Sequence, residues 1–339
     1  MVAGIALTTA LLVTGVLVLG VGSVRIPAGD VLDVVLRRMW PGHADVSPVT
    51  DRIVWELRLP RVLAAAAVGA GLALCGAALQ SLTGNDLADP YLLGVSSGAA
   101  LGAVMTIVLG WTPPPDVPAG LATSVGAFAG ALGALVLVLA LAAGRSGDLP
   151  PARTILAGVA VAQLAGAGTS LVVMVFGDRQ GAREVLAWTL GSFAGVRTTS
   201  AWVLVAGAVL ATVLLTGSAR TLDAFAFGET SARSLGVDVG RARWTFFVGC
   251  ALVTAGTVAV VGPIGFVGLT VPHVVRLVVG PAHAFLLPLS ALTGALLMVW
   301  SDTAARSLAS GQEIPVGVVT ALVGAPVLVV LLRRQARQV

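Results

Sequence analysis

Long stretches without a charged side chain constrain this 339-residue chain more than any other feature. Nine runs of at least 19 residues lack Asp, Glu, Lys and Arg, and they cover residues 1–24, 62–85, 90–115, 117–144, 154–177, 198–219, 244–275, 277–301 and 314–332. A helix that crosses a hydrocarbon core needs roughly 20 apolar residues, so each run is long enough for one membrane span. Only 11% of the residues are charged and the mean hydropathy is +0.98, which excludes a soluble globular domain.

The run 244–275 is too long for one span. Gly262 and Pro263 divide it, because proline lacks a backbone N–H and disfavours helix in the residue before it. Ten helical segments result, and the eighth, at about 264–279, is short. The first run lacks a basic start and exceeds the usual apolar length of a signal peptide, so we interpret it as a retained helix. The predicted fold is an all-α polytopic membrane protein with about ten transmembrane helices, in which residues 1–339 form a single domain.

The ionisable residues restrict the energy source. All 20 basic residues besides histidine are arginine, so the chain has no lysine for a P-loop or for a Schiff base. His273 and His283 are the only ionisable candidates within the spans, whereas ion-coupled carriers usually place acids or histidines there. We interpret His273 as a capping or packing residue. The pattern favours a transporter that another subunit energises with ATP.

Cysteine and histidine positions predict no metal site or cofactor. Cys75 and Cys250 lie in apolar runs, and the three histidines share no ligand spacing with them.

The segment Gly94–Gly98 matches the G-x-S-x-G pattern of a hydrolase nucleophile, with Ser96 as the serine. That nucleophile requires a strand before it and a helix after it, whereas this segment lies in an apolar helical stretch. Gly94, Gly98 and Gly102 are four residues apart, a spacing that places them on one helix face for close packing. Packing is therefore favoured over a membrane-embedded hydrolase.

The longest polar loop on the predicted inner side covers residues 218–243 and is predicted to form two short helices. Thr221 or Asp223 is expected to cap the first helix, Glu229 and Thr230 to begin the second, and Gly236 to end it in a left-handed conformation. Apolar side chains among the charges suit the docking of a soluble partner, namely Phe225, Phe227 and Leu235. An ordinary interfacial loop is the alternative.

The arginines leave the topology undecided at first. Ten spans place both termini on one side, and Arg333, Arg334 and Arg337 favour the cytoplasm. With that orientation the inner loops and tail hold ten arginines and the outer loops hold the other ten. Six of the outer arginines lie between residues 23 and 61, which indicates a specific need for positive charge there.

Six motifs in order resemble the FecCD-type permeases, the type II ABC importers through which bacteria take up iron-siderophores, haem and vitamin B12. The motifs are RLPR (58–61), GAALQ (76–80), NDLADPYLLGVSSGAALGA (85–103), LDAFAFGETSARSLGV (222–237), GPIGFVGLTVPHVVR (262–276) and EIPVGVVTALVGAPVLVVLL (313–332). The resemblance implies the permease subunit of a binding-protein-dependent importer in the bacterial cytoplasmic membrane. An ATP-independent secondary transporter or channel is the alternative.

The resemblance also implies partners: a second permease that is another copy or a related chain, two cytoplasmic ATPase subunits, an extracytoplasmic binding protein and a metal-chelate substrate, but no nucleic acid. Arg58, Arg61 and Arg306 match arginines that face acidic residues of the binding protein. Without these three, ten inner arginines stand against seven outer ones, and the topology agrees with the positive-inside rule.

Three further sets of residues take roles from the resemblance. The ATPase-coupling set is Leu222, Asp223, Phe225, Gly228, Glu229, Ala232, Arg233, Leu235 and Gly236. Asn85 and Leu87 match a cytoplasmic gate, where Asp86 replaces the proline of many relatives and could pair with a nearby arginine. Gly158, Gly166, Thr169 and Ser170 in the fifth span are expected to line a pathway between two permease copies, with helix packing as an equal alternative.

Overall fold

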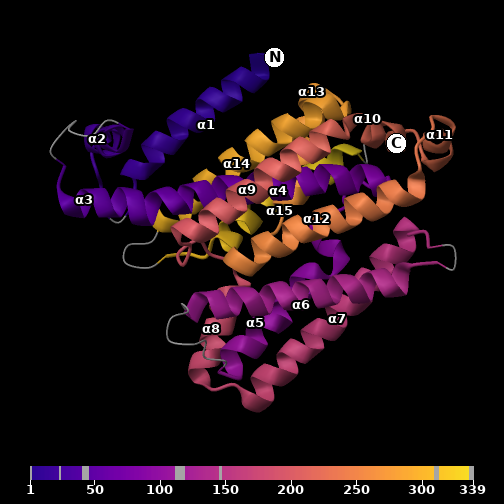
Figure 1. Cartoon of the computed structure of the whole chain (residues 1–339), viewed down its shortest axis with the longest axis horizontal. Helices are drawn as coiled ribbons and strands as arrows, with labels where there is room; N and C mark the ends of the chain where they lie inside the picture. The colour runs from indigo at the N-terminus through magenta and orange to yellow at the C-terminus, as the bar shows by residue number, and fades with distance from the viewer. Residues whose placement is uncertain are drawn as a thin grey trace.

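Helices make up the regular structure of the described part of the chain, and no strand occurs there (Figure 1). The structure is a computed structural model that describes residues 2–22, 24–39, 46–110, 119–144, 147–308 and 313–335. Arg337, one of the arginines that favoured a cytoplasmic C-terminus, lies outside these ranges.

The ten predicted membrane segments are all present as helices. Seven continuous helical stretches in the described residues are long and apolar enough to cross a membrane, and three shorter apolar helices bring the number to ten. The long stretches contain α1 (Val2–Gly20), α4 (Leu59–Thr83), α6 (Ala119–Ala142), α7 (Pro151–Phe176), α9 (Thr198–Gly217), α12 (Val239–Val261) and α14 (His283–Ser307). The shorter helices are α5 (Val95–Val108), α13 (Val267–Val279) and α15 (Val316–Gln335).

The predicted break at Gly262 and Pro263 is confirmed, since α12 ends at Val261 and α13 begins at Val267. Phe266 adopts a left-handed conformation with φ of 71°, unusual for a residue with a side chain. The hydroxyl of Tyr91 accepts a hydrogen bond from Ile264 N at 2.8 Å and donates one to Ile264 O at 3.0 Å. A side chain from a distant part of the sequence thus satisfies the backbone groups that the break leaves unpaired.

The second membrane helix begins earlier than predicted. Helix α3 (Pro48–Arg52), the π-helical segment η1 (Ile53–Arg58) and α4 form one continuous helix, so Arg58 and Arg61 lie inside a helix and not before it. The apolar-run criterion missed this start because charged residues interrupt the run. Pro60 has no N–H for the preceding turn, and the helix widens to π geometry just before it.

Helix α4 is the central helix of the molecule and packs against α9, α12, α13 and α14. Glycine permits the closest of these approaches. A Cβ built on Gly76 would lie 1.8 Å from Gly268 O of α13, and one on Gly69 would lie 2.1 Å from Gly294 O of α14. Backbone-to-backbone packing of this kind is how apolar helices associate where lipid removes the hydrophobic driving force.

Helices α5 to α8 form a second group beside this one, with α8 at Arg179–Thr189 (Figure 1). The predicted packing role of the G-x-S-x-G segment is confirmed here. A Cβ on Gly98 would lie 2.5 Å from Gly130 O of α6, one on Gly102 would lie 2.1 Å from Gly126 O, and one on Gly94 would lie 3.0 Å from Gly158 O of α7.

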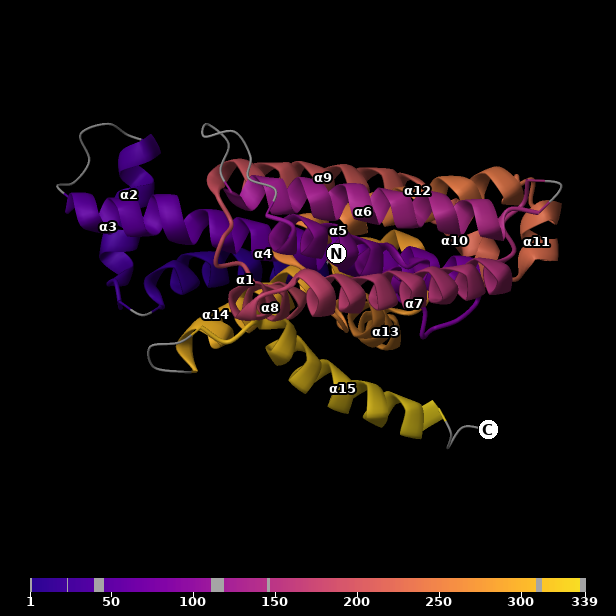
Figure 2. The ribbon, with the colours of Figure 1, turned by 90° about the horizontal axis from the view of Figure 1, so that it is seen from below.

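The helical bundle has two distinct ends, which Figures 1 and 2 show at opposite sides. One end carries α2 (Ala28–Met39) and α3, and we call it the arginine end. The other carries α10 (Ala219–Ala226) and α11 (Glu229–Ser234), and we call it the coupling end. The sequence search missed the amphipathic helices α2 and α8, because their charged residues interrupt the apolar runs.

Helix α15 leaves the bundle as it extends from the arginine end (Figure 2). It contacts α13 and α14, and its Gly324 lies against the ring of Phe266. The end of α1 and the start of α15 both lie near the arginine end. The other ends of these two helices therefore point away from it.

Candidate functional site

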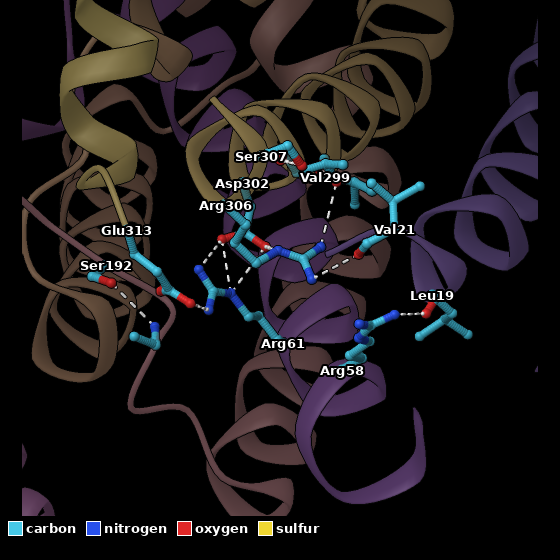
Figure 3. A network of polar contacts seen from close by, with 12 residues as sticks. Leu19, Val21, Arg58, Arg61, Ser192, Val299, Asp302, Arg306, Ser307 and Glu313 are labelled. Carbon is cyan, nitrogen blue, oxygen red and sulfur yellow. Dashed lines mark hydrogen bonds and ion pairs between the residues drawn. The ribbon is translucent and has the colours of Figure 1, made fainter. Parts of the chain in front are cut away.

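Three arginines gather at the arginine end, where α1 and α14 meet the junction of η1 and α4 (Figure 3). They are Arg58, Arg61 and Arg306, the residues for which the resemblance implies docking. The apolar environment of these helices requires that each guanidinium find acceptors, because an unpaired buried charge is costly.

Arg61 and Arg306 share one buried acid, Asp302. The Nε of Arg61 donates to both carboxylate oxygens of Asp302 at 3.0 and 3.1 Å, and the Nε of Arg306 lies 3.1 Å from Asp302 Oδ2. The Asp302 side chain is 1% exposed. Asp302 and Arg306 are four residues apart on α14 and therefore on one helix face, whereas Arg61 comes from 241 residues earlier.

A second acid connects this buried pair to the surface. Arg61 Nη1 donates to Glu313 Oε1 at 3.1 Å and to Oε2 at 2.9 Å, and the Glu313 side chain is 49% exposed. Glu313 lies three residues before the start of α15. Arg61 thus joins α4, α14 and the entry to α15.

Arg58 has backbone acceptors instead of an acid. Its guanidinium donates to the carbonyl oxygens of Leu19, at 2.6 Å, and Val24. Gly22 allows this approach, because a Cβ at that position would lie 2.8 Å from Arg58 Nη2. We call Arg58, Arg61, Arg306, Asp302 and Glu313 the arginine cluster; with three cations and two anions it carries a net charge of +1.

All three guanidinium groups are therefore held by contacts within the chain, and both Arg58 and Arg61 are buried. The implied contact with a binding protein stays a prediction. Of the cluster, Glu313 is the member whose side chain reaches the surface most openly, so an acidic partner would meet Arg61 at the place that Glu313 occupies.

At the coupling end, the loop 218–243 forms two short helices, as predicted. Helix α11 begins at Glu229, and Gly236 follows it with φ of 83°. The predicted capping of the first helix is wrong: no side chain caps α10, which begins after Ser218. Asp223 lies in the middle of α10 and accepts instead from the backbone N of His283, at the start of α14, at 2.9 Å.

The residues expected to couple to an ATPase fall into two groups. Leu222, Phe225 and Ala232 are buried in the core, with Phe225 only 5% exposed, so Phe225 is not part of an exposed docking surface. Phe227 and Leu235 are exposed, at 76% and 68%. Gly228, between the two helices, has φ of 88° and turns the chain there.

One ion pair attaches α11 to α12, and a second one lies within α11. Glu229 accepts from Arg243 Nη2 at 2.8 Å and from Arg233 Nη2 at 2.7 Å. The hydrogen bond from Arg243, followed by that from Arg233, holds the pKa of Glu229 below its ordinary value. The exposed apolar residues of the loop thus stand on a braced pair of helices.

The predicted gate residues lie in a tight turn after α4, which we call the gate loop (residues 84–89). Asn85 Oδ1 accepts from Leu87 N at 2.9 Å. The expectation that Asp86 could pair with a nearby arginine is confirmed: Arg276 Nη1 of α13 donates to Asp86 Oδ1 at 2.6 Å. The gating role itself stays a prediction.

The four predicted pathway residues on α7 do not share one environment. Gly158 is buried against the segment η2 (Pro90–Leu93), where a Cβ would lie 1.9 Å from Leu92 O, so it is a packing position. Gly166 and Ser170 are exposed, and the Ser170 hydroxyl donates to Gly166 O at 3.0 Å. Thr169 is half-buried. Only part of the set is thus open to a pathway.

Two acids of the arginine cluster were not found by sequence reasoning, namely Asp302 and Glu313. Asp302 follows the eighth run and Glu313 precedes the ninth and last one, so both looked like loop charges. The spacing of four between Asp302 and Arg306 was the one local signal for a pair.

Comparisons with known proteins agree with this architecture. The chain matches the FecCD transport family over residues 10–334. It is 45% identical over 293 residues to the cobalamin import system permease protein BtuC of Halobacterium salinarum, covering 86% of this chain and 76% of that protein. It is 37% identical to the hemin transport system permease protein HmuU of Yersinia pestis, covering 95% and 93%.

Among solved structures, one of an ABC transporter of the metal-chelate type, in an inward-facing conformation, matches with a TM-score of 0.84 and 30% identity over 98% of both chains. The ten apolar helices of the described residues agree with the membrane-permease class of these relatives. The chain belongs to the FecCD transport family and is a multi-pass membrane permease subunit of an ABC importer.

Proposed function

We propose that this permease forms the translocation pathway for a metal chelate, either a corrinoid or an iron chelate such as a siderophore complex or haem. The relatives named for cobalamin and for hemin support this class. The fold match to a transporter of the metal-chelate type supports it as well.

The observation that carries the proposal is the difference between the two ends. The arginine end holds a cluster with a net positive charge, which suits an extracytoplasmic binding protein that presents carboxylates. The coupling end presents Phe227 and Leu235 directly after α10 and α11, which suits insertion into a groove of a cytoplasmic ATPase. In this orientation both termini lie in the cytoplasm.

The complete importer in this proposal contains a second permease, identical or related, and two ATPase subunits. The pathway runs between the permeases, with Gly166, Thr169 and Ser170 of α7 on its wall, and Asn85 and Leu87 close its cytoplasmic side. The chain has no lysine for a P-loop, so the hydrolysis of ATP belongs to the partner subunits.

Reconstitution into liposomes tests the proposal. The permease is combined with the ATPase and binding protein encoded by neighbouring genes, and cyanocobalamin, haemin and a ferric siderophore are supplied in turn. We expect ATP-dependent uptake of one chelate class, and no uptake when the P-loop lysine of the ATPase is replaced. Uptake by the permease alone, driven by an ion gradient, would contradict the proposal.

A further inference from the structure

Three polar side chains from three separate elements meet at the coupling end: Asp223 of α10, His283 at the start of α14 and Ser81 near the end of α4. His283 Nδ1 donates to Asp223 Oδ1 at 2.7 Å. His283 Nε2 is hydrogen-bonded to Ser81 Oγ at 2.6 Å. We call this chain of contacts the relay.

The first contact of the relay is a cap supplied from another element. Asp223 Oδ1 accepts from both the ring and the backbone N of His283, the latter at 2.9 Å. The first N–H groups of a helix have no partner within it, and a carboxylate there also meets the positive end of the helix dipole. Asp223 thus binds the coupling helix α10 to the start of the membrane helix α14 by two hydrogen bonds to a charged group.

The second contact extends the connection to α4. The His283 side chain is 2% exposed, and both of its ring nitrogens are paired. Ser81 is half-buried, and its Oγ also lies 3.2 Å from Ala77 O of its own helix. The order Ser, His, Asp is that of a hydrolase triad, but the histidine, which would have to reach a substrate, is buried with both ring nitrogens occupied. We therefore interpret these contacts as structural connections between α4, α14 and α10.

The neighbouring residue on α4 continues the connection to the gate loop. Gln80 Oε1 accepts from Arg276 Nη2 of α13 at 2.9 Å, and the same arginine holds Asp86 at 2.6 Å. Two adjacent residues at the end of α4 therefore connect to different places. Ser81 is linked through His283 to the coupling helix α10, and Gln80 is linked through Arg276 to the gate loop.

We propose that the relay makes α10, α14 and the end of α4 move as one unit, with His283 as the positioning residue through which the coupling helix displaces the gate loop. The inference rests on the proposed function, in which an ATPase moves α10. A movement of α10 reaches α4 only if the contacts between them persist during that movement. The two hydrogen bonds from His283 to the Asp223 carboxylate are charge-assisted and therefore among the stronger contacts available for this role.

The test is the amount of chelate transported per ATP hydrolysed by the reconstituted importer. Asp223→Asn and His283→Asn each weaken a relay contact, and we expect this ratio to fall about tenfold, since a hydrogen bond to a charged group is lost or weakened. ATPase binding and basal ATP hydrolysis are expected to persist in His283→Asn, because His283 is 2% exposed and does not belong to the ATPase-coupling set. Asp178→Asn is the matched control. Asp178 caps the start of α8 by accepting from Gly181 N, and the substitution is expected to leave the ratio unchanged.

A double-mutant cycle separates a relay from independent contacts. If the chain acts as one unit, Asp223→Asn combined with Ser81→Ala lowers the ratio no further than the stronger single variant. Multiplied losses in the double variant would overturn the proposal, as would a normal ratio in both Asp223→Asn and His283→Asn. An importer whose unaltered form fails to transport with ATP contradicts the proposed function instead, so the two failures are distinguishable.

A distance measurement covers the case in which a relay variant fails to fold. Spin labels at Arg220→Cys on α10 and Phe285→Cys on α14, both exposed positions, are introduced with Cys75 and Cys250 replaced by alanine. The relay predicts that this distance stays constant with and without ATP. A change in the distance between nucleotide states would show that α10 and α14 move separately and would overturn the proposal.

Discussion

Single buried charges at the arginine end determine how three helices meet. Asp302 forms ion pairs with both Arg61 and Arg306, and neither arginine has another buried carboxylate within the cluster. In a low-dielectric environment, removal of one partner leaves the remaining charges uncompensated, which costs more than the pair itself contributes. The acid is thus essential for the fold of this end, even though its net contribution as an ion pair is small.

We expect Asp302→Asn to lower the free energy of unfolding by about 3–5 kcal/mol, because two buried guanidinium groups lose their shared anion. Unfolding in detergent micelles, followed by circular dichroism, measures the change. Glu56→Gln is the control: Glu56 pairs with Arg52 at the surface, where both side chains are more than half exposed, and its effect is expected to stay below about 1 kcal/mol. Equal effects of the two variants would contradict the assigned role of Asp302.

Pairs of helices depend on the absence of side chains at particular glycines. Along α6, Gly130 faces α5, and a Cβ there would lie 2.2 Å from Gly98 O, whereas a Cβ on Gly133 would meet nothing within 4 Å. The two positions differ by less than one turn, but only one of them lies at the helix interface.

Gly130→Ala is expected to destabilise the protein by about 1–3 kcal/mol, because the added methyl group forces α5 and α6 apart. Gly133→Ala is expected to be neutral or to stabilise α6 by up to about 1 kcal/mol, since alanine restricts the unfolded chain. Thermal unfolding of the two variants in the same detergent compares them. A destabilised Gly133→Ala or an unaffected Gly130→Ala would show that the helix pair is packed differently.

The attachment of α11 to α12 gives the coupling end a pH dependence. Arg243 and Arg233 lower the pKa of Glu229, so the folded state favours the carboxylate form. The resulting stabilisation is complete above the ordinary pKa of 4.5 and is lost as the pH falls through the lowered folded pKa. Because the Glu229 side chain is 40% exposed, we expect a contribution below about 1 kcal/mol.

Unfolding free energies of the unaltered protein and of Glu229→Gln, measured between pH 3 and 7, check this prediction. The difference between the two is expected to be largest above about pH 5 and to shrink toward pH 3, since the unaltered protein gains the same neutral side chain there. If the difference in unfolding free energy between the two proteins grew as the pH fell, the prediction would be wrong, because a lowered pKa requires the opposite trend.

At the scale of the whole molecule, the arginine end connects a surface acid with the last helix. Glu313 neutralises Arg61 from the surface and lies just before α15. If a binding protein docks here through carboxylates, its acids compete with Glu313 for the same guanidinium. Docking would then change the contacts at the start of α15.

Glu313→Gln is expected to raise the affinity for the binding protein by about threefold to tenfold, because the loss of the Glu313 carboxylate leaves Arg61 with Asp302 as its anion in the cluster. High salt should reduce the gain. Titration of the binding protein onto the permease in nanodiscs at two salt concentrations measures it. Glu184→Gln on α8 removes an exposed acid that contacts Gln180 and serves as the control for net charge. A lower affinity of Glu313→Gln would place docking elsewhere.

Much of the fold could be predicted because the deciding signals are local. Ten helices, the break at Gly262 and Pro263, and the turn at Gly236 follow from apolar runs and from backbone restrictions of single residues. The start of α4 and the amphipathic helices α2 and α8 could not be predicted in this way, because charged residues interrupt their apolar pattern.

The sequence by itself determined that the chain crosses a membrane about ten times and cannot bind ATP through a P-loop lysine. Only the tertiary structure decided which charges meet: Arg61 with Asp302 across 241 residues, and Asp223 with His283 across 60. The physical reason is that apolarity acts on each segment separately. The pairing of a buried charge depends on which distant helix brings an acceptor to it, and spacing along the chain does not contain that information.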